Sequence, residues 1–361
     1  MIDPVELTRR LIAMDTAGSG EERAARFLGG LLEAAGARVA YDAFAPGRAS
    51  LVAYAGNPSV RPLALSGHLD TVPADPASWS SDPFGPVVTN GRIVGRGASD
   101  MKSGVAVLVS ALVRHLAHGA GVPAVVLVLS AAEETGCEGV QHLVDHVALP
   151  CGGPLLVAEP TGNRVATGHK GALWVRAGAS GVSAHGSRPD LGVSAITPLA
   201  AFALALAEAG VPGSHPAMGR ATTNVGTFQG GVRTNLVPDA AEMTVDVRLV
   251  PGVSSAETLT YLTRLAGPRV CIETILDRAP VYSRPDAPLA TLAQTIAGGE
   301  PCPPLSYFTD ASVLAEALGA SETVFLGPGD PEAAHTTDES VAVASITRGA
   351  ELYAAILERW S

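Results

Sequence analysis

Short runs of branched apolar residues, each followed by a loop or a helix, dominate the first half of the chain. The runs LVAYAG, PLALSG, AVVLVLS and PLLVAE contain almost no polar residue that would mark a solvent-facing side. Stretches 103–119 and 138–147, which lie between such runs, have apolar residues at helical spacing. Continuous apolar strands that alternate with helices are typical of a sheet covered on both faces. The sequence therefore predicts an α/β domain with a mostly parallel sheet.

The pattern changes at about Gly171. A strand, a helix, two strands, a helix and a strand follow, and the run AEMTVDVRLV alternates apolar with polar residues, which predicts one solvent-facing side. The order βαββαβ is that of the ferredoxin-like unit. An α/β pattern returns after Arg278. We therefore expect an α/β domain formed by residues 1–170 and 279–361, interrupted by an inserted α+β domain at 171–278.

Composition narrows the class of protein. With 361 residues the chain exceeds the usual size of one hydrophobic core, and 47% hydrophobic residues provide for a large one. The formal net charge of −11 argues against a nucleic-acid partner, which requires a basic face. No apolar run approaches the ~20 residues that span a bilayer, the N-terminus lacks a signal-peptide pattern, and the four cysteines form no CxxC pair. We expect a cytoplasmic protein that binds neither nucleic acid nor membrane.

Residues with metal-ligand chemistry follow three of the apolar runs, and another, Asp100, lies just before an expected helix. They are His68, Asp70, Asp100, Glu133, Glu134 and Glu159. Because the carboxyl ends of parallel strands meet at one edge of a sheet, we expect these residues to converge. Crowded carboxylates raise each other's pKa unless cations neutralise them, and oxygen and imidazole ligands without thiolate suit zinc, cobalt or manganese. Singly, His68, Asp100 and Glu159 also have structural explanations, as a core histidine, a helix N-cap and a turn residue respectively. Their joint occurrence at successive strand ends predicts a metal centre.

Four motifs in this region, SGHLDTVP, GRGASDMKSG, SAAEETG and VAEPTG, resemble in order and spacing the M20 family of dinuclear zinc aminoacylases and peptidases. A fifth motif, LGPGDPEAAHTTDES, lies near the C-terminus, so the resemblance covers nearly the whole chain. It implies a zinc-exopeptidase-like catalytic domain that holds two divalent metal ions, zinc first, with cobalt or manganese as alternatives. Two departures from the family pattern, Leu69 and Ala158, remove no ligand but leave the subfamily open.

The resemblance also implies a role for each metal ligand. Asp100 would bridge the two metal ions, and the peptide bond after it would be cis. His68 and Glu159 would complete one metal site, and Glu134 and His335 would complete the other. The ligand set therefore draws on both sequence segments of the catalytic domain.

Two further acidic residues would act beside these ligands. Asp70 would accept the imidazole N–H of His68 and thereby orient that ring. Glu133 would take a proton from the attacking water and return it to the leaving amine. Adjacent side chains on an extended backbone point different ways, so Glu133 and Glu134 can serve different purposes. The implied reaction is hydrolysis of the amide bond of an N-acyl amino acid or a dipeptide.

The inserted domain carries another motif, SAHGSRPDLG, which contains His185. By resemblance, this histidine would cross a homodimer interface and stabilise the oxyanion in the partner's active site. The inserted domain would then serve for dimerisation and as a lid. The resemblance also implies a set of substrate-binding residues, although the arginine among them has an alternative explanation as part of a solvated strand face. They are Lys170, Asn235, Arg248, Thr309 and Asp310.

Two histidines fall outside these motifs. His142 and His146 lie four residues apart on an expected helix, a spacing that suits a metal ion. No HExxH glutamate accompanies them, so we interpret QHLVDHV as a solvated helix face.

The first expectation for function is an acetylornithine deacetylase-like enzyme of amino-acid biosynthesis. Within the same chemistry, the alternatives are a succinyl-diaminopimelate desuccinylase and a dipeptidase or glutamate carboxypeptidase. From other classes, a dinuclear metallophosphoesterase and a catalytically silent metal-stabilised binding protein also fit a cluster of this kind. The intact Glu133 argues against the silent protein, because a binding protein has no need of a base.

Overall fold

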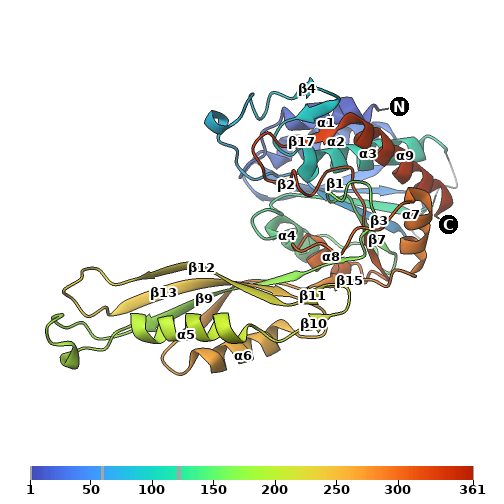
Figure 1. Cartoon of the computed structure of the whole chain (residues 1–361). Helices are drawn as coiled ribbons and strands as arrows, with labels where there is room; N and C mark the ends of the chain where they lie inside the picture. Colours follow the sequence, from blue (N-terminus) through green and yellow to red (C-terminus); the bar gives the residue numbers. More distant parts are fainter. Residues whose placement is uncertain (1, 58–60, 120–122, 361) are drawn as a thin grey trace. The chain divides into compact units, whose positions relative to one another are not determined.

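The computed structural model describes residues 2–57, 61–119 and 123–360, and these residues divide into two compact units (Figure 1). The first unit comprises the described residues up to Gly168, together with Tyr282–Pro303 and the described residues from Thr309 onward. The second comprises His169–Val281 and Pro304–Phe308. The chain leaves the first unit within β8 (Gly168–His169) and returns within β15 (Val281–Tyr282).

A six-stranded sheet forms the centre of the first unit, in the order β1-β2-β6-β3-β7-β16. Strands β6, β3, β7 and β16 are parallel, whereas β1 and β2 are antiparallel to their neighbours. Every residue of β3 and β6 is buried, as expected for a sheet covered on both faces. The predicted, mostly parallel α/β sheet is therefore confirmed. The strands are β1 (Arg38–Ala45), β2 (Arg48–Ala55), β3 (Leu63–His68), β6 (Val125–Ser130), β7 (Leu155–Val157) and β16 (Thr323–Phe325).

Helices cover both faces of this sheet (Figure 1). Helices α2 and α3 pack on one face with α1, α7 and α9 beside them, and α4 and α8 pack on the other. Val105, Leu108 and Leu112 of α3 are fully buried, and each such side chain contributes about 1.5–3 kcal/mol to folding. The helices are α1 (Pro4–Ile12), α2 (Glu21–Ala34), α3 (Ser103–Leu116), α4 (Glu138–His146), α7 (Pro288–Ala297), α8 (Ala311–Ala317) and α9 (Val343–Arg359).

A small antiparallel sheet, β17-β5-β4, connects the C-terminal part of the first unit to the segment before Asp100. The predicted Asn90–Gly91 turn joins β4 to β5, and both turn residues have positive φ (48° and 72°). Pairing of β17 with β5 places Glu339 beside Gly95, whose N–H donates to the Glu339 carbonyl at 2.9 Å. The elements are β4 (Val87–Thr89), β5 (Arg92–Val94), β17 (Ser340–Ala342) and a single-turn helix η1 (Pro76–Ser78).

The second unit is an antiparallel sheet of order β12-β13-β9-β14 with α5 and α6 packed against it. Apart from a short two-stranded hairpin between α5 and β12, its chain order is β9-α5-β12-β13-α6-β14, which confirms the predicted βαββαβ unit. On β13 the predicted alternation holds: Met243, Val245 and Val247 are buried. The elements are β9 (Gly171–Ser180), η3 (Pro189–Leu191), α5 (Ile196–Ala209), β10 (Ser214–His215), β11 (Gly219–Arg220), β12 (Thr222–Gly230), β13 (Ala240–Leu249), α6 (Ser255–Ala266) and β14 (Cys271–Arg278). No helix among the described residues has the length and apolar character to cross a bilayer.

Candidate active site

Three neighbouring parallel strands of the first unit end in residues with ionisable side chains. His68 is the last residue of β3, Glu133 and Glu134 follow β6, and Glu159 follows β7. Asp100 lies in η2 (Ala98–Lys102), a wide turn that leads into α3. Because β6, β3 and β7 are adjacent and parallel, their carboxyl ends meet at one edge of the sheet. The convergence predicted from the sequence therefore occurs.

The Asp100 carboxylate faces two histidines, one with each oxygen. Its Oδ1 lies 3.1 Å from His68 Nε2, and its Oδ2 lies 3.3 Å from His335 Nε2. The same His335 nitrogen lies 2.9 Å from Oε1 of Glu134. One ligand atom from each of His68, Asp100 and Glu134 lies within 4.8 Å of the others. A carboxylate that has a ligand group at each of its oxygens is able to hold two cations, and the peptide bond after Asp100 is cis, as expected.

Asp70 connects the ends of β3 and β6. Its two carboxylate oxygens accept the backbone N–H groups of Glu133 and Glu134, each at 3.1 Å. The Nδ1 atom of His68 lies 3.1 Å from the Asp70 main-chain carbonyl and 3.5 Å from its carboxylate. A carbonyl only accepts, so Nδ1 keeps its proton, and Nε2, which faces Asp100, is the nitrogen that would give up its proton to bind a cation. Asp70 therefore holds the turn at Glu133 and Glu134, called the glutamate turn below, and it keeps a proton on Nδ1 of His68.

Burial of so many carboxylates has a clear electrostatic consequence. Burial raises the pKa of Glu133 and of Glu159 well above the usual value, and the charges of neighbouring carboxylates add to this rise. Burial also raises the pKa of Glu134. At Asp100 burial opposes ionisation, but hydrogen bonds from His335 and His68 lower its pKa. An electron-rich, buried set of carboxylates and imidazoles fits divalent cations, which neutralise it.

Glu339, which the sequence reasoning missed, holds the turn that carries Asp100. Its Oε1 accepts the backbone N–H of Ser99 at 2.7 Å and that of Asp100 at 2.9 Å. Its Oε2 accepts the backbone N–H of Gly97 at 2.9 Å and the Arg96 guanidinium at 2.7 Å. Glu339 is 1% exposed. The only sequence signal for this role is its place in the C-terminal histidine motif.

Thr309 and Asp310 lie at the start of α8, inside the first unit. The Asp310 carboxylate accepts a short hydrogen bond from the hydroxyl of Ser130, the last residue of β6. Burial raises the pKa of Asp310 to about 6. Thr309 Oγ1 accepts the backbone N–H of Ala311 at 3.1 Å. Both side chains are buried, so they support the strand end that leads to Glu133.

Within the second unit, His185 and Asn235 lie on paired segments. Gly186 N–H donates to the Asn235 carbonyl at 2.8 Å, and His185 forms an isolated β-bridge with Leu236. The His185 ring is exposed, and its Nδ1 accepts the backbone N–H of Ser187 at 3.1 Å. This nitrogen is therefore unprotonated in the neutral ring, so Nε2 carries the proton and is available as a donor.

Lys170 and Arg248 form another group in the second unit. Lys170 Nζ donates to the Arg220 carbonyl at 2.7 Å, and burial together with the charge of Arg248 lowers the pKa of Lys170. Arg248 donates to the Asp246 carboxylate through Nε at 3.1 Å and contacts the face of the Phe308 ring at 5.7 Å. Its Nη1 is buried and has no hydrogen-bond partner within residues 2–57, 61–119 and 123–360. One buried guanidinium N–H group thus lacks a partner in the described part of the chain.

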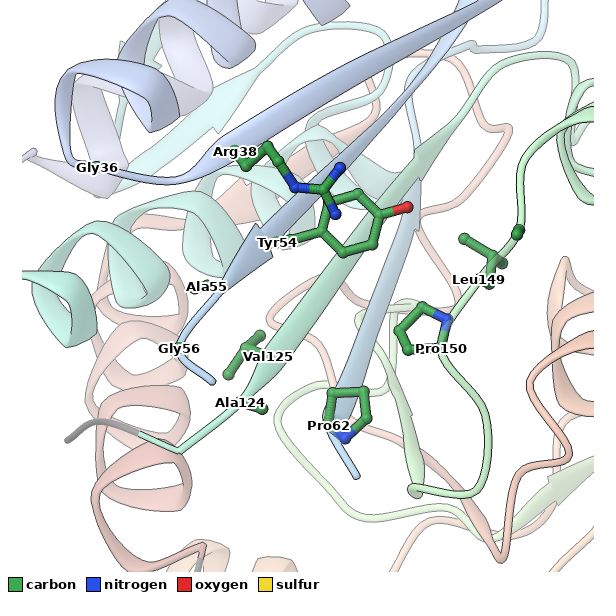
Figure 2. Close-up of a pocket in the computed structure, with 11 residues that line it drawn as sticks. Gly36, Arg38, Tyr54, Ala55, Gly56, Pro62, Ala124, Val125, Leu149 and Pro150 are labelled. Atoms are coloured by element: carbon green, nitrogen blue, oxygen red, sulfur yellow. The ribbon is translucent and has the colours of Figure 1, made fainter. Parts of the chain in front are cut away.

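A cavity of about 460 Å³ lies elsewhere in the first unit, at the beginning of strands β3 and β6 (Figure 2). The Arg38 guanidinium lies 4.1 Å above the ring of Tyr54 there, and Pro62, Val125 and Leu149 also line the cavity. None of the converging ionisable residues lines it. Because ligands of open α/β sheets bind at the carboxyl ends of strands, the candidate active site lies at the opposite edge.

Comparison with known proteins agrees with this geometry. A model of the peptidase family M20/M25/M40 matches residues 64–359. An acetylornithine deacetylase of Edwardsiella ictaluri is 31% identical, over 77% of this chain and 74% of its own length. A probable carboxypeptidase of Aspergillus clavatus is 28% identical, over 97% of this chain and 87% of its own length. The M20 metallo-carboxypeptidase Sso-CP2 of Sulfolobus solfataricus has the same fold, with a TM-score of 0.80, 18% identity and 99% of each chain covered.

These similarities extend over both units, and the M20/M25/M40 model includes every converging residue at the strand ends. The relatives are deacetylases and peptidases, which cleave amide bonds. The protein is therefore an amide-bond hydrolase, and it belongs to the peptidase family M20/M25/M40.

Proposed function

We propose that the protein is a two-metal deacylase that hydrolyses the amide bond of an N-acyl amino acid, with N-acetyl-L-ornithine as its substrate. The observation that carries this proposal is the geometry at Asp100, whose two carboxylate oxygens face His68 and His335. The deacetylase relative with 31% identity supports an acyl-amino-acid substrate.

Five side chains would hold the cations, with zinc expected first and cobalt or manganese as alternatives. They are His68, Asp100, Glu134, Glu159 and His335. The fit rests on the donor set itself: imidazole nitrogens and buried carboxylates whose pKa is raised in the absence of cations. When bound, two divalent cations supply Lewis acidity, which favours ionisation of water and stabilises negative charge on an amide carbonyl oxygen.

Glu133 would move the proton. Glu133 is 8% exposed and follows the same strand as Glu134, and the raised pKa of its carboxyl suits a group that both accepts and donates a proton. It takes a proton from the attacking water, holds it on a carboxyl oxygen and transfers it to the leaving amine nitrogen. Asp70 keeps Glu133 in place by accepting its backbone N–H.

The second unit would complete the site in a homodimer. Exposed apolar side chains on and after β12, among them Val225, Phe228 and Val232, support its use as a dimerisation surface. In that dimer the protonated Nε2 of His185 stabilises the developing oxyanion of the other copy's active site. The second unit thereby also acts as a lid.

The substrate carboxylate would bind the cationic group of the second unit. Arg248 has a buried N–H group without a partner in the described part of the chain, and Lys170 lies near enough for its pKa to respond to that charge. Asn235 is exposed beside the His185 segment and would bind the acyl carbonyl region. Thr309 and Asp310, buried beneath the Glu133 strand, would shape the pocket rather than contact its solvent-facing part.

The experiment is a comparison of substrates with the zinc-reconstituted protein. Free-amine release is measured on N-acetyl-L-ornithine, N-succinyl-LL-diaminopimelate and a dipeptide, each with and without a chelator. We expect chelator-sensitive turnover of the acetyl substrate, with kcat/KM at least ten times that of the others. Equal or greater turnover of the succinyl substrate would replace the proposed substrate. Cleavage of a generic phosphate ester without amide cleavage would replace the proposed chemistry.

Carboxypeptidase activity is a second candidate, because the relative that covers 97% of this chain is a probable carboxypeptidase. Both activities require a carboxylate next to the scissile amide, so the cationic group formed by Lys170 and Arg248 serves either. An N-blocked dipeptide with a free carboxyl group distinguishes them. Its turnover above that of N-acetyl-L-ornithine would favour the carboxypeptidase.

A further inference from the structure

A second group of metal-ligand side chains lies in the first unit and shares no residue with the candidate active site. His142 and His146 are one turn apart on α4, and Asp42 lies on β1. One ligand atom from each of the three lies within 4.8 Å of the others. The sequence placed the histidines on a solvated helix face; the fold adds a carboxylate that is 100 residues from His142 in the chain.

Hydrogen bonds determine which nitrogen of each ring is free. His142 Nδ1–H donates to Asp42 Oδ2 at 2.7 Å, and His146 Nδ1–H donates to the His142 carbonyl at 2.7 Å. Carboxylate and carbonyl oxygens only accept, so both rings are protonated at Nδ1 and carry a lone pair on Nε2. Neither Nε2 atom has a hydrogen-bond partner within the described residues. A ring N–H held by a carboxylate or carbonyl, with the other nitrogen free, is the usual state of a metal-binding histidine.

The two rings also lie close enough to share one cation. Their centroids are 4.0 Å apart and their planes differ by 23°. A cation at ~2.0–2.1 Å from each Nε2 requires the nitrogens to be about 3.3 Å apart. Because the rings are stacked, the exposed His146 ring has to turn out of the stack so that both Nε2 lone pairs point to one cation. The Asp42 side chain is only 10% exposed, so its charge acts on the site with little screening by water.

Two simpler explanations account for part of this geometry. Asp42 and His142 can form an ion pair, and a histidine in the last turn of a helix is favoured by the helix dipole. The ion pair involves Nδ1 of His142, and the helix end involves His146, whose Nδ1 donates to a carbonyl of the last turn. Neither explanation gives a role to the Nε2 atoms. Two stacked imidazoles would repel each other if both were protonated, whereas one cation satisfies both lone pairs.

We propose that His142 and His146 bind a divalent transition-metal cation of the zinc class through their Nε2 atoms, with Asp42 fixing the His142 ring. Imidazole ligands without thiolate suit Zn²⁺, Cu²⁺, Ni²⁺ and Co²⁺. The bound cation connects α4 to β1. Helix α4 begins just after the glutamate turn, where the N–H of Cys137 donates to the Glu133 carbonyl at 3.0 Å. The cation therefore stabilises the fold next to the proposed catalytic turn without touching it.

Zinc counting tests the proposal. The full-length protein and its variants are dialysed against buffered free Zn²⁺ over a range of concentrations, and bound zinc per chain is measured by plasma mass spectrometry. At saturation we expect the wild type to bind one more zinc ion than either His142→Gln or His146→Gln. Asp42→Asn should weaken that additional ion by about 10–100-fold, because it removes the charge that holds the ring.

His118→Gln is the matched control. His118 is also exposed, and its Nδ1 also lies near the carbonyl of the residue four positions earlier, Arg114, at 3.0 Å. It belongs to no ligand group found among the described residues. This variant should bind as much zinc as the wild type.

The test compares bound zinc per chain between the wild type and each variant. Zinc ions in the active site are counted in every sample, so they cancel in this difference. Loss of amide hydrolysis in every sample would count against the proposed function and leave this difference unchanged. Hydrolysis by the zinc-loaded protein should be the same in the wild type and His146→Gln, whereas added Zn²⁺ should raise the melting temperature above its value in chelator more for the wild type than for His146→Gln. Equal zinc binding by the wild type and both histidine variants would overturn the proposal, as would an equal loss in His118→Gln.

Discussion

One carboxylate oxygen of Glu339 accepts the backbone N–H of Asp100 at 2.9 Å. The two residues are 239 positions apart in the chain. The same glutamate lies four residues after His335, so one C-terminal loop carries a proposed ligand and also holds the turn of Asp100, the proposed bridging carboxylate. The proposed metal site therefore depends on a residue that is not itself a proposed ligand of metal or substrate.

Replacement of Glu339 tests this dependence. In Glu339→Gln an amide N–H₂ must face backbone donors, and the buried Arg96 loses its ionic partner. We expect a loss of about 3 kcal/mol in the free energy of unfolding, measured by urea titration. Zinc affinity, measured by chelator competition, should also fall. The control is Glu332→Gln in the same loop, because Glu332 is exposed. Unchanged stability and unchanged zinc affinity in Glu339→Gln would contradict the assigned role.

Replacement of the adjacent residues Glu133 and Glu134 should impair the enzyme in different ways. Glu133→Gln removes the proposed base, so kcat should fall by about 10²–10⁴-fold while both metals stay bound. Glu134→Gln removes a proposed ligand that lies 2.9 Å from His335, so it should lose metal as well as activity. Metal content and kcat are measured on the same preparations. Wild-type turnover by metal-loaded Glu133→Gln would exclude Glu133 as the base.

Mixed dimers test whether His185 acts on the other copy of the chain. Glu133→Gln and His185→Asn are each expected to be nearly inactive as homodimers. After the two variants are unfolded together and refolded, half of the dimers carry one intact site, so activity should recover to about a quarter of the wild-type value. Light scattering establishes the dimer. No recovery despite mixed dimers would show that Glu133 and His185 must come from the same chain.

His169 should make stability depend on pH. It is fully buried, and burial lowers its pKa from 6.5 to about 4. The folded protein therefore binds fewer protons than the unfolded chain between these values, so stability is complete above about pH 6.5 and falls as the pH drops toward 4. The loss is at most about 3 kcal/mol.

Urea titrations of the wild type and His169→Gln at several pH values in this range isolate that contribution. Other groups titrate in both proteins, so the difference between the two pH slopes belongs to His169. We expect a steeper loss of stability with acid in the wild type. Parallel slopes would mean that His169 is as easily protonated in the folded chain as in the unfolded one.

The sequence by itself determined the classes of the elements and most of the proposed ligands. Apolar runs without alternation predicted β3 and β6 as strands buried on both faces, and alternation predicted the half-exposed β13. Among these ligands, His68 and Glu134 were identified because each lies at or just after the end of such a run. These features are local, since periodicity and strand ends are visible within a few neighbouring residues.

Only the tertiary structure decided which side chains meet. The pairing of β17 with β5 places Glu339 next to the turn of Asp100. The packing of α4 on β1 places Asp42 next to His142. Asp310, expected among the substrate-binding residues, meets the hydroxyl of Ser130 inside the first unit. Each of these partners is separated by at least 100 residues in the chain. Sheet register and helix packing set such contacts, and no local pattern of the sequence encodes them.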